Sequence, residues 1–292
     1  VLPPPERAPV RAPRYFQSLD AANSDGAPVT FDPDYKTSCV TLSEGNLATN
    51  AASYSANSCG GVAATHEGVS SGKYYVELSC SGDGTYRGLG FVDKAAFTDA
   101  NQAANGLLYA TCSGSDCLSM VRNAVKCHLD GGYCGGYGFR VAESPGGDHD
   151  FALYTRGGNA AGSYGIESME TDVPSFLGFA IDLDEKKLWI GTETQTDDSD
   201  SLTWWPDDPG LGCGWDWSRG HCSAAGGTVC SSDSDCSGAD TCTMWRGEPL
   251  TFMVNGDGGA SYFTARFSED DWLWPRPGAA KAPPSAALPT GR

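Results

Sequence analysis

Three evenly spaced cysteines stand in an acidic stretch near the carboxyl end of the chain. The stretch GGTVCSSDSDCSGADTC, residues 226–242, places Cys230, Cys236 and Cys242 six residues apart with aspartates between them. Such residues suit a metal site, a redox device or a set of disulfides that holds a loop. Zinc ribbons and thioredoxin-like redox sites usually need a Cys-x-x-Cys pair, and the sequence contains none. The spacing therefore favours disulfides.

The whole chain follows the same pattern, with 12 cysteines among 292 residues. An even number without Cys-x-x-Cys predicts disulfides and an oxidising compartment. Zinc at Cys127 and His128 is disfavoured because the spacings of the neighbouring cysteines are irregular. The disulfide candidates fall into three groups: Cys39, Cys59 and Cys80; Cys112, Cys117, Cys127 and Cys134; and Cys213, Cys222, Cys230, Cys236 and Cys242. Two groups are odd in number, so at least one bridge must join two groups, and Cys213 is the candidate for it.

Aromatic and acidic residues crowd residues 195–245, which hold nine Asp, one Arg and five of the eight Trp. Aromatic rings stack on sugars or fill protein hot spots, and carboxylates bind hydroxyl groups or calcium. One interpretation is a binding loop, and the other is a local tryptophan core packed on disulfides. No stretch fits an EF-hand loop, so we expect no cofactor, with Ca²⁺ left as an alternative. The binding candidates are Trp204, Trp205, Asp207, Asp208, Trp215 and Trp217.

Charge divides the chain into an acidic body and two basic ends. The net charge is -18 with a pI near 4.4, which disfavours binding to nucleic acid and to anionic membrane surfaces. No apolar run approaches the length of a membrane span. The ends carry local charges of +2 and +3 and ten of the 17 prolines, which leaves about -23 on the body. We expect extended arms that dock on neighbouring subunits through Arg7, Arg11, Arg14, Arg276 and Lys281.

Between the arms the pattern is β. Short runs rich in β-branched and aromatic residues alternate with Gly, Ser, Asn and Asp. A hairpin turn is expected over residues 184–187 and another turn at Asn255-Gly256. Residues 93–108 could hold a helical turn or two at most. Many strands without helical crossovers predict an all-β antiparallel sandwich of the jelly-roll type. The runs cover residues 38–43, 73–80, 87–92, 137–142, 151–155, 176–184, 187–193, 250–255 and 260–267.

Six segments add a more specific signal. They are Gly72–Glu77, Gly88–Phe91, Tyr137–Arg140, Gly178–Asp184 with Leu188 and Trp189, Ala265–Phe267, and Trp274–Gly278. In their order these segments resemble the SPRY domain family over roughly residues 30–278. The resemblance implies a concanavalin-like sandwich of two curved antiparallel sheets that binds partners through loops at one end, and most members are not enzymes. Insertions near residues 93–135 and 195–247 hold cysteines, so the chain looks like an extracellular, disulfide-rich variant.

These expectations define the domains: an arm over residues 1–14, a SPRY-like sandwich over 15–278 and a tail over 279–292. The chain begins at Val1, and we interpret it as processed and secreted. The G-x-S-x-G match at residues 68–72 precedes a strand rather than a helix, which disfavours a hydrolase.

We therefore expect a non-enzymatic, extracellular structural or adhesive subunit of an appendage, coat or virion surface, with copies of itself or other assembly proteins as partners. The alternatives are a secreted lectin-like glycan-binding module and a jelly-roll glycan-cleaving enzyme, whose carboxylate pair the fold would bring together.

All or nearly all of the cysteines should be oxidised, with Cys222, Cys230, Cys236 and Cys242 paired among themselves. Their even number and the closeness of the four in the chain are the reasons for this expectation. Peptide mapping under non-reducing conditions checks it. Several free thiols, or stoichiometric zinc in elemental analysis, would contradict the extracellular interpretation.

Overall fold

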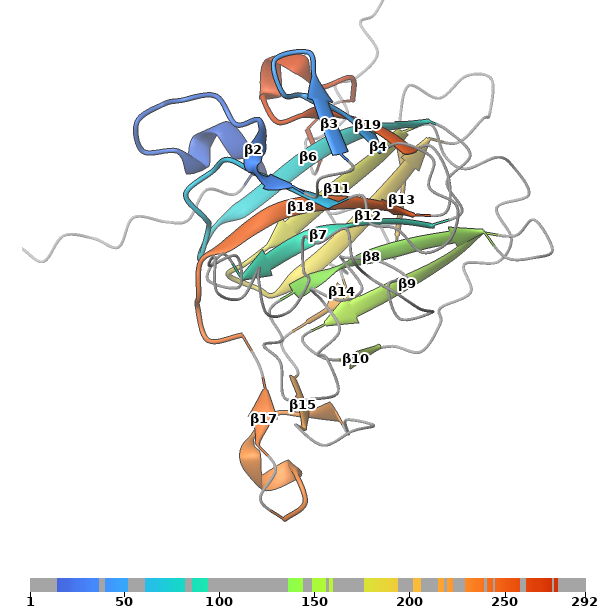
Figure 1. The fold of residues 1–292 in the computed structure, drawn as a ribbon. Coiled ribbons are helices and arrows are strands. Elements are labelled where there is room, and N and C mark those ends of the chain that lie inside the picture. The colour runs from blue at the N-terminus through green and yellow to red at the C-terminus, as the bar shows by residue number, and fades with distance from the viewer. Residues whose placement is uncertain are drawn as a thin grey trace, which may run out of the picture.

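Two packed β-sheets form the body of the molecule in the computed structural model (Figure 1). The described part of the chain contains strands and three short 3-10 helices, η1 (Leu19–Ala22), η5 (Asp233–Asp235) and η6 (Glu269–Asp271), and no α-helix. The structure describes residues 15–36, 40–51, 61–81, 86–93, 136–143, 149–155, 158–159, 176–193, 202–205, 215–217, 220–222, 229–238, 241–243, 245–257, 261–274 and 276–277. The predicted arm over residues 1–14, the tail over 279–292 and most of the insertion near 93–135 lie outside these residues.

The first sheet has nine strands and is built around β6. Its strands are antiparallel except that β1 (Gln17–Ser18) runs parallel to β6, and β14 (Trp215–Asp216) adds to β12. The order of the main path is β13 (Leu202–Trp205), β12 (Lys187–Glu193), β11 (Phe176–Asp182), β6 (Lys73–Ser81), β19 (Ser261–Arg266), β4 (Ala48–Ala51) and β3 (Val40–Ser43).

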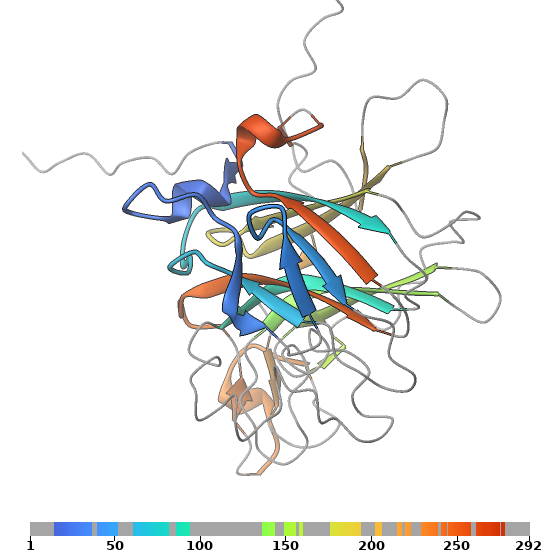
Figure 2. The ribbon, with the colours of Figure 1, turned by 45° about the horizontal axis from the view of Figure 1, so that its top comes forward.

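The second sheet has seven strands, and a small third sheet has three. Figure 2 shows the two large sheets as layers, with the small sheet outside them. The second sheet runs in the order β10 (Gly158–Asn159), β9 (His149–Thr155), β8 (Gly136–Glu143), β7 (Tyr86–Asp93), β18 (Leu250–Asp257), β5 (Gly61–Ala64) and β2 (Phe31–Lys36). The third consists of β16 (Val229–Cys230), β15 (Gly220–Cys222) and β17 (Cys242–Thr243).

The fold is thus the antiparallel sandwich that the pattern predicts, and all nine expected runs contain a strand. The hairpin turn occupies residues 183–186, between β11 and β12. The turn expected at Asn255-Gly256 was wrong. Both residues continue β18, where they pair with Gly88 and Arg87 of β7, because an available partner strand outweighs the local turn preference of an Asn-Gly pair.

Side-chain alternation along β6 divides the structure into an inner and an outer layer. Tyr74, Val76 and Leu78 belong to the main core between the sheets, and Tyr75 and Glu77 face the other side. Rings from three other strands fill the centre of that core. The Phe91 centroid lies 5.8 Å from that of Phe179 and 5.5 Å from that of Phe252. Burial of each such side chain contributes roughly 1.5–3 kcal/mol, so these rings help to hold the two sheets together.

The outer face of the nine-stranded sheet holds a second apolar cluster. Phe16, Tyr75, Ala180, Trp189 and Leu202 are buried there, with Trp204, Trp272 and Trp274 packed against them. The cross-strand pair Gly178 and Gly191 leaves room for these side chains. A Cβ on Gly178 would lie 2.5 Å from Leu202 Cδ1 and 3.0 Å from Tyr75 Oη. The absence of two side chains on the strands therefore admits the large residues that cover them.

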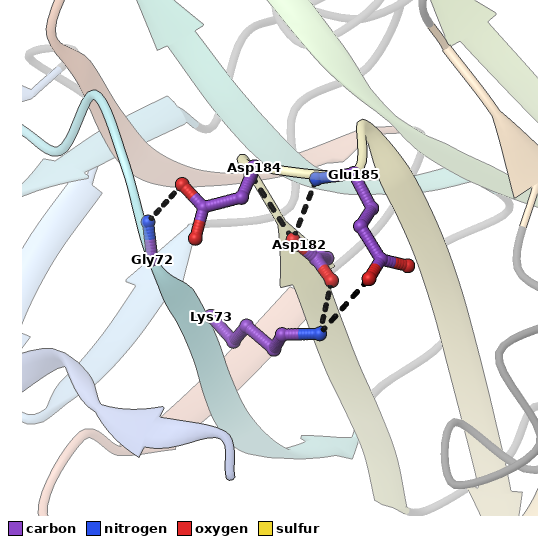
Figure 3. A network of polar contacts seen from close by, with 5 residues as sticks. All are labelled: Gly72, Lys73, Asp182, Asp184 and Glu185. Carbon is purple, nitrogen blue, oxygen red and sulfur yellow. Dashed lines mark hydrogen bonds and ion pairs between the residues drawn. The ribbon is translucent and has the colours of Figure 1, made fainter. Parts of the chain in front are cut away.

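A buried carboxylate fixes the turn between β11 and β12 (Figure 3). Asp182 is fully buried, and its Oδ1 accepts hydrogen bonds from the backbone N–H groups of Asp184 and Glu185 at 3.0 and 2.9 Å. Its Oδ2 lies 2.5 Å from Nζ of Lys73, the facing residue on β6. Asp184 in turn accepts a hydrogen bond from the N–H of Gly72 at 3.0 Å. The network ties the hairpin to β6.

Replacing Asp182 with Ala should lower the free energy of unfolding by about 2–4 kcal/mol. The variant leaves the Lys73 ammonium, whose side chain is 21% exposed, without its partner, and it removes the acceptor of two backbone N–H groups. Urea titration measures the effect. The matched control is Glu185→Gln, because Glu185 is 64% exposed and 3.9 Å from the same ammonium and should change stability by less than about 0.5 kcal/mol. Equal effects of the two variants would show that the buried pair does not hold the hairpin.

Candidate binding site

The amino-terminal end of the described chain pairs with a strand in the middle of the nine-stranded sheet. Strand β19 ends at Arg266, opposite Glu77, so the first residues of β6 have no neighbour from β19. Strand β1 fills this place by pairing Gln17 and Ser18 with Tyr74 and Tyr75. The N–H of Leu19 then donates to the carbonyl of Phe267 at 3.1 Å. The ring of Phe16 packs edge-on against Trp189, with centroids 5.6 Å apart.

The last described segment is held beside it by Glu77. This residue is 4% exposed and accepts hydrogen bonds from two backbone N–H groups, Leu273 to Oε2 at 2.7 Å and Trp274 to Oε1 at 3.0 Å. Tyr75 Oη also donates to Oε1 at 3.0 Å. Hydrogen bonds to a charged group are stronger than neutral ones, at about 1.5–3 kcal/mol each. One carboxylate thus anchors the chain beyond η6, about two hundred residues away in sequence.

Tyr75 lies at the centre of this arrangement. Burial raises the pKa of Tyr75, and the negative charge of Glu77 and its hydrogen bond raise it further. The phenol therefore stays protonated and remains a donor to Glu77. Its ring is edge-on to Trp272, with centroids 4.7 Å apart, and tilted against Trp204 at 5.8 Å. We call residues 15–18 and 268–277, with the outer-face residues that hold them, the terminal clasp.

The two halves of the terminal clasp meet at its surface. The guanidinium of Arg276 lies over the ring of Tyr15 at 5.9 Å and forms an ion pair with Glu269. Tyr15 is 54% exposed and Leu273 is 49% exposed, and only Tyr262 joins them as an exposed large hydrophobic residue in the described chain. Residues 1–14 and 278–292 therefore both continue from one small area that also exposes apolar surface.

A second candidate is the disulfide knob, which we define as residues 220–243. It contains the small third sheet, the disulfide between Cys230 and Cys242 with Cα atoms 5.8 Å apart, and Cys236, which is also disulfide-bonded. The aspartates of its loop bind backbone. Asp233 accepts from Cys242 N–H at 2.7 Å, and the hydrogen bonds from the N–H groups of Ser231 and Ser232 lower the pKa of Asp235. The acidic Cys-rich stretch is therefore a loop held by disulfide bonding and by hydrogen bonds from backbone N–H groups to its aspartates.

Two tryptophans flank the neck of the disulfide knob. Trp217 precedes it and Trp245 follows it, and their ring centroids are 5.1 Å apart. The backbone N–H of Trp217 donates to the backbone carbonyl of Lys186 in the β11–β12 turn at 3.0 Å. Trp245 Nε1 donates to the carbonyl of Glu248 at 2.8 Å. The knob projects from the packed sheets in Figure 1 from this fixed neck.

The structure separates the tryptophans that the sequence grouped as binding candidates. Trp217 is 2% exposed and packs within the main core; that at least one of these tryptophans contacts a partner stays a prediction. Trp204 is half-buried in the terminal clasp. Trp205 and Trp215 lie on β13 and β14, and Asp207 and Asp208 fall outside the described residues.

Of the other assigned residues, Arg276 lies in the terminal clasp and Cys80 is buried on β6. The described residues do not include Arg7, Arg11, Arg14, Lys281 or the cysteines at 39, 59, 112, 117, 127, 134 and 213.

Within the described ranges, no three His, Cys, Asp or Glu residues gather as metal ligands would. No helix among them is both long and apolar enough to cross a membrane.

The sequence interpretation missed Glu77, Tyr75 and Trp272 as parts of a site. The available signal was a charged residue within the apolar strand KYYVELSC and two tryptophans in alternate positions at DWLW. In a strand, such a charge is expected on the solvent side. Here it faces outward as expected, but a second segment of the chain covers it.

Comparison with known proteins gives distant structural similarities. No family model and no curated protein matches the sequence. The TRIM65 PSpry domain is similar with 11% identity and a TM-score of 0.42, covering 82% of this chain and 92% of that one. A stonustoxin structure has 13% identity and the same TM-score, over 86% of this chain but only 30% of the other. Both likenesses are distant, and the SPRY resemblance of residues 30–278 remains a resemblance.

Replacing Glu77 with Gln should open the terminal clasp locally. The amide keeps one acceptor oxygen but turns an NH₂ group toward donors that the carboxylate now accepts from. A loss of about 1.5–3 kcal/mol corresponds to roughly 10- to 100-fold faster hydrogen exchange at the amides of Leu273 and Trp274. Amides of β7 and β18 should exchange as before. The control is Glu269→Gln at the exposed rim, and unchanged exchange in the Glu77 variant would show that other contacts hold the segment.

Proposed function

We propose that this chain is a non-enzymatic β-sandwich subunit of a larger extracellular assembly, with a structural or adhesive role, that binds proteins through segments displayed from the sandwich. The observation that carries the proposal is the meeting of the two end segments in the terminal clasp. Tyr15 and Arg276, from which the two basic, proline-rich arms continue, are in contact. A partner at this place would meet both arms at once.

The physical argument begins with charge. The arms carry Arg7, Arg11, Arg14 and Lys281, and the body carries about -23. Opposite charge speeds encounter and fixes the relative orientation of two proteins. A proline-rich segment loses less chain entropy on docking than a flexible one, because it is already extended. If every copy both donates and accepts an arm, the contact is head-to-tail, and such contacts close into rings or continue as filaments.

The disulfide knob supports a role outside the cell. Its small sheet has too little apolar surface to fold alone, and a disulfide that closes a loop of this size contributes on the order of 3 kcal/mol by restricting the unfolded chain. Such bonds persist in oxidising compartments. The neck at Trp217 and Trp245 holds the knob in a defined direction. A rigid protrusion of this kind suits an adhesive contact.

Deleting residues 1–14, 278–292 or both from the full chain tests the proposal. We expect each deletion to lower the mass of the native assembly in light scattering while the β-type circular dichroism spectrum is kept. The deletions start beyond the terminal clasp, so its contacts to Glu77 remain. Raising the salt from 0.1 M to 1 M should also weaken the assembly, since the Debye length falls from about 10 Å to about 3 Å. Assembly of the doubly shortened chain like that of the full chain would refute this role of the arms.

A further inference from the structure

Three indole N–H groups in the terminal clasp are buried, and no described residue accepts their hydrogen bonds. They belong to Trp189, Trp272 and Trp274, and Trp189 as a whole is only 2% exposed. A buried donor without an acceptor is rare in native proteins and costs about 1–3 kcal/mol. The indole N–H of Trp245 has an acceptor, the carbonyl of Glu248. The clasp therefore gathers donors that an acceptor from elsewhere would satisfy.

We propose that the terminal clasp is the docking site for the proline-rich arm, residues 1–14, of a second copy of this chain. The inference rests on the proposed function and names the contact by which one subunit holds the next. The indole N–H groups of Trp272 and Trp274 are buried, so docking would turn these partly exposed rings and bring the N–H groups to the carbonyl groups of the arm.

The chemistry of the two surfaces matches. A polyproline segment makes no internal hydrogen bonds, so its carbonyl groups remain available as acceptors, and its rings pack on aromatic side chains. The terminal clasp offers Trp272 and Trp274 as partly exposed rings with Leu273 exposed between them. The arm VLPPPERAPVRAP holds five prolines. Aromatic surfaces with indole donors are a recurrent way to recognise such segments.

Charge on the rim of the terminal clasp adds specificity. Asp270 and Asp271 are exposed immediately before Trp272. Glu269 is already paired with Arg276 of the same chain, which leaves those two carboxylates for a partner. The arm brings Arg7, Arg11 and Arg14, spaced four and three residues apart. An arginine beside the prolines would meet the aspartates while the prolines meet the rings.

The arm of a second copy fits better than the arm of the same chain. The arm leaves its own clasp at Tyr15, next to Phe16, which is already packed on Trp189. Reaching Trp272 in the same clasp would require the arm to fold back on itself. Prolines fix their own backbone and keep the preceding residue extended, which opposes such a turn. Fourteen residues in polyproline form span roughly 43 Å at 3.1 Å per residue, enough to cross to a neighbouring molecule.

The decisive variants remove the donors and keep the rings. In the full chain, Trp272→Phe combined with Trp274→Phe should weaken self-association roughly tenfold or more in sedimentation equilibrium, the result expected from the loss of two hydrogen bonds. Stability should not fall by the cost of lost hydrogen bonds, because these donors have no acceptor within the described chain. The matched control is Trp245→Phe, which loses the bond to Glu248 and should lower stability with no effect on association. Asp270→Asn with Asp271→Asn should reduce the salt dependence of association.

Cross-linking identifies the occupant directly and does not depend on those variants. A photoreactive phenylalanine replaces Val10 in full-length chains that carry either of two different tags, and the two forms are mixed before illumination. Cross-links from position 10 to residues 268–277 of a differently tagged copy are expected. Cross-links only within one copy, only to other surfaces, or not at all would overturn the proposal, as would unchanged association of the Trp-to-Phe double variant.

The same experiments separate this inference from the proposed function. If deletion of residues 1–14 abolishes assembly but the double variant associates normally, the arm docks elsewhere and only the assigned site is wrong. If the full chain shows no assembly that depends on its arms, the proposed function itself fails. Association lost in the double variant and inter-copy cross-links at the terminal clasp together support both.

Discussion

The structure depends on the burial of one carboxylate, that of Glu77, beneath the last described segment of the chain. An ionised group without partners would be too costly to remove from water. Here Tyr75 Oη and the N–H groups of Leu273 and Trp274 donate to its oxygens, so the charge is stabilised where it lies. Because those donors come from the same strand and from the far end of the fold, satisfying Glu77 also determines where the segment beyond η6 must run.

Strand β6 transmits this constraint to the rest of the molecule. Its inner side chains belong to the main core, its first residues pair with β1, and Lys73 at its start holds Asp182 in the β11–β12 turn. The backbone carbonyl of Lys186, in the same turn, accepts a hydrogen bond from the backbone N–H of Trp217 at the neck of the disulfide knob. A short series of polar contacts thus connects the terminal clasp, the hairpin and the knob, and ties both displayed features to one sheet.

The pattern of short runs rich in β-branched and aromatic residues, separated by Gly, Ser, Asn and Asp, was enough to predict the nine principal strands and the β11–β12 hairpin. It missed β2, which contains Pro33, and β4 and β5, which are short and rich in alanine, since neither type carries a strong strand signal. The terminal clasp could not be predicted from the sequence, because Glu77 and Trp274 are 197 residues apart. No local pattern states which distant segment will cover a charge. The burial of Trp217 could not be predicted for a related reason, because it depends on Trp245 and on the hairpin turn, which only the fold brings to it.

The proposed assembly has to overcome repulsion between bodies that each carry about -23. That repulsion acts over the distance between whole subunits, whereas an arginine of an arm and an aspartate of the terminal clasp would lie in contact. Screening near 0.1 M salt, with a Debye length of about 10 Å, removes most of the long-range repulsion and leaves most of the attraction between groups in contact. Only at much higher salt would the contact pairs weaken too, and the indole hydrogen bonds and apolar packing would then have to hold the arm. Because the positive charge is concentrated in the two end segments of the sequence, such subunits would stay apart when dilute and still bind one another at a defined place.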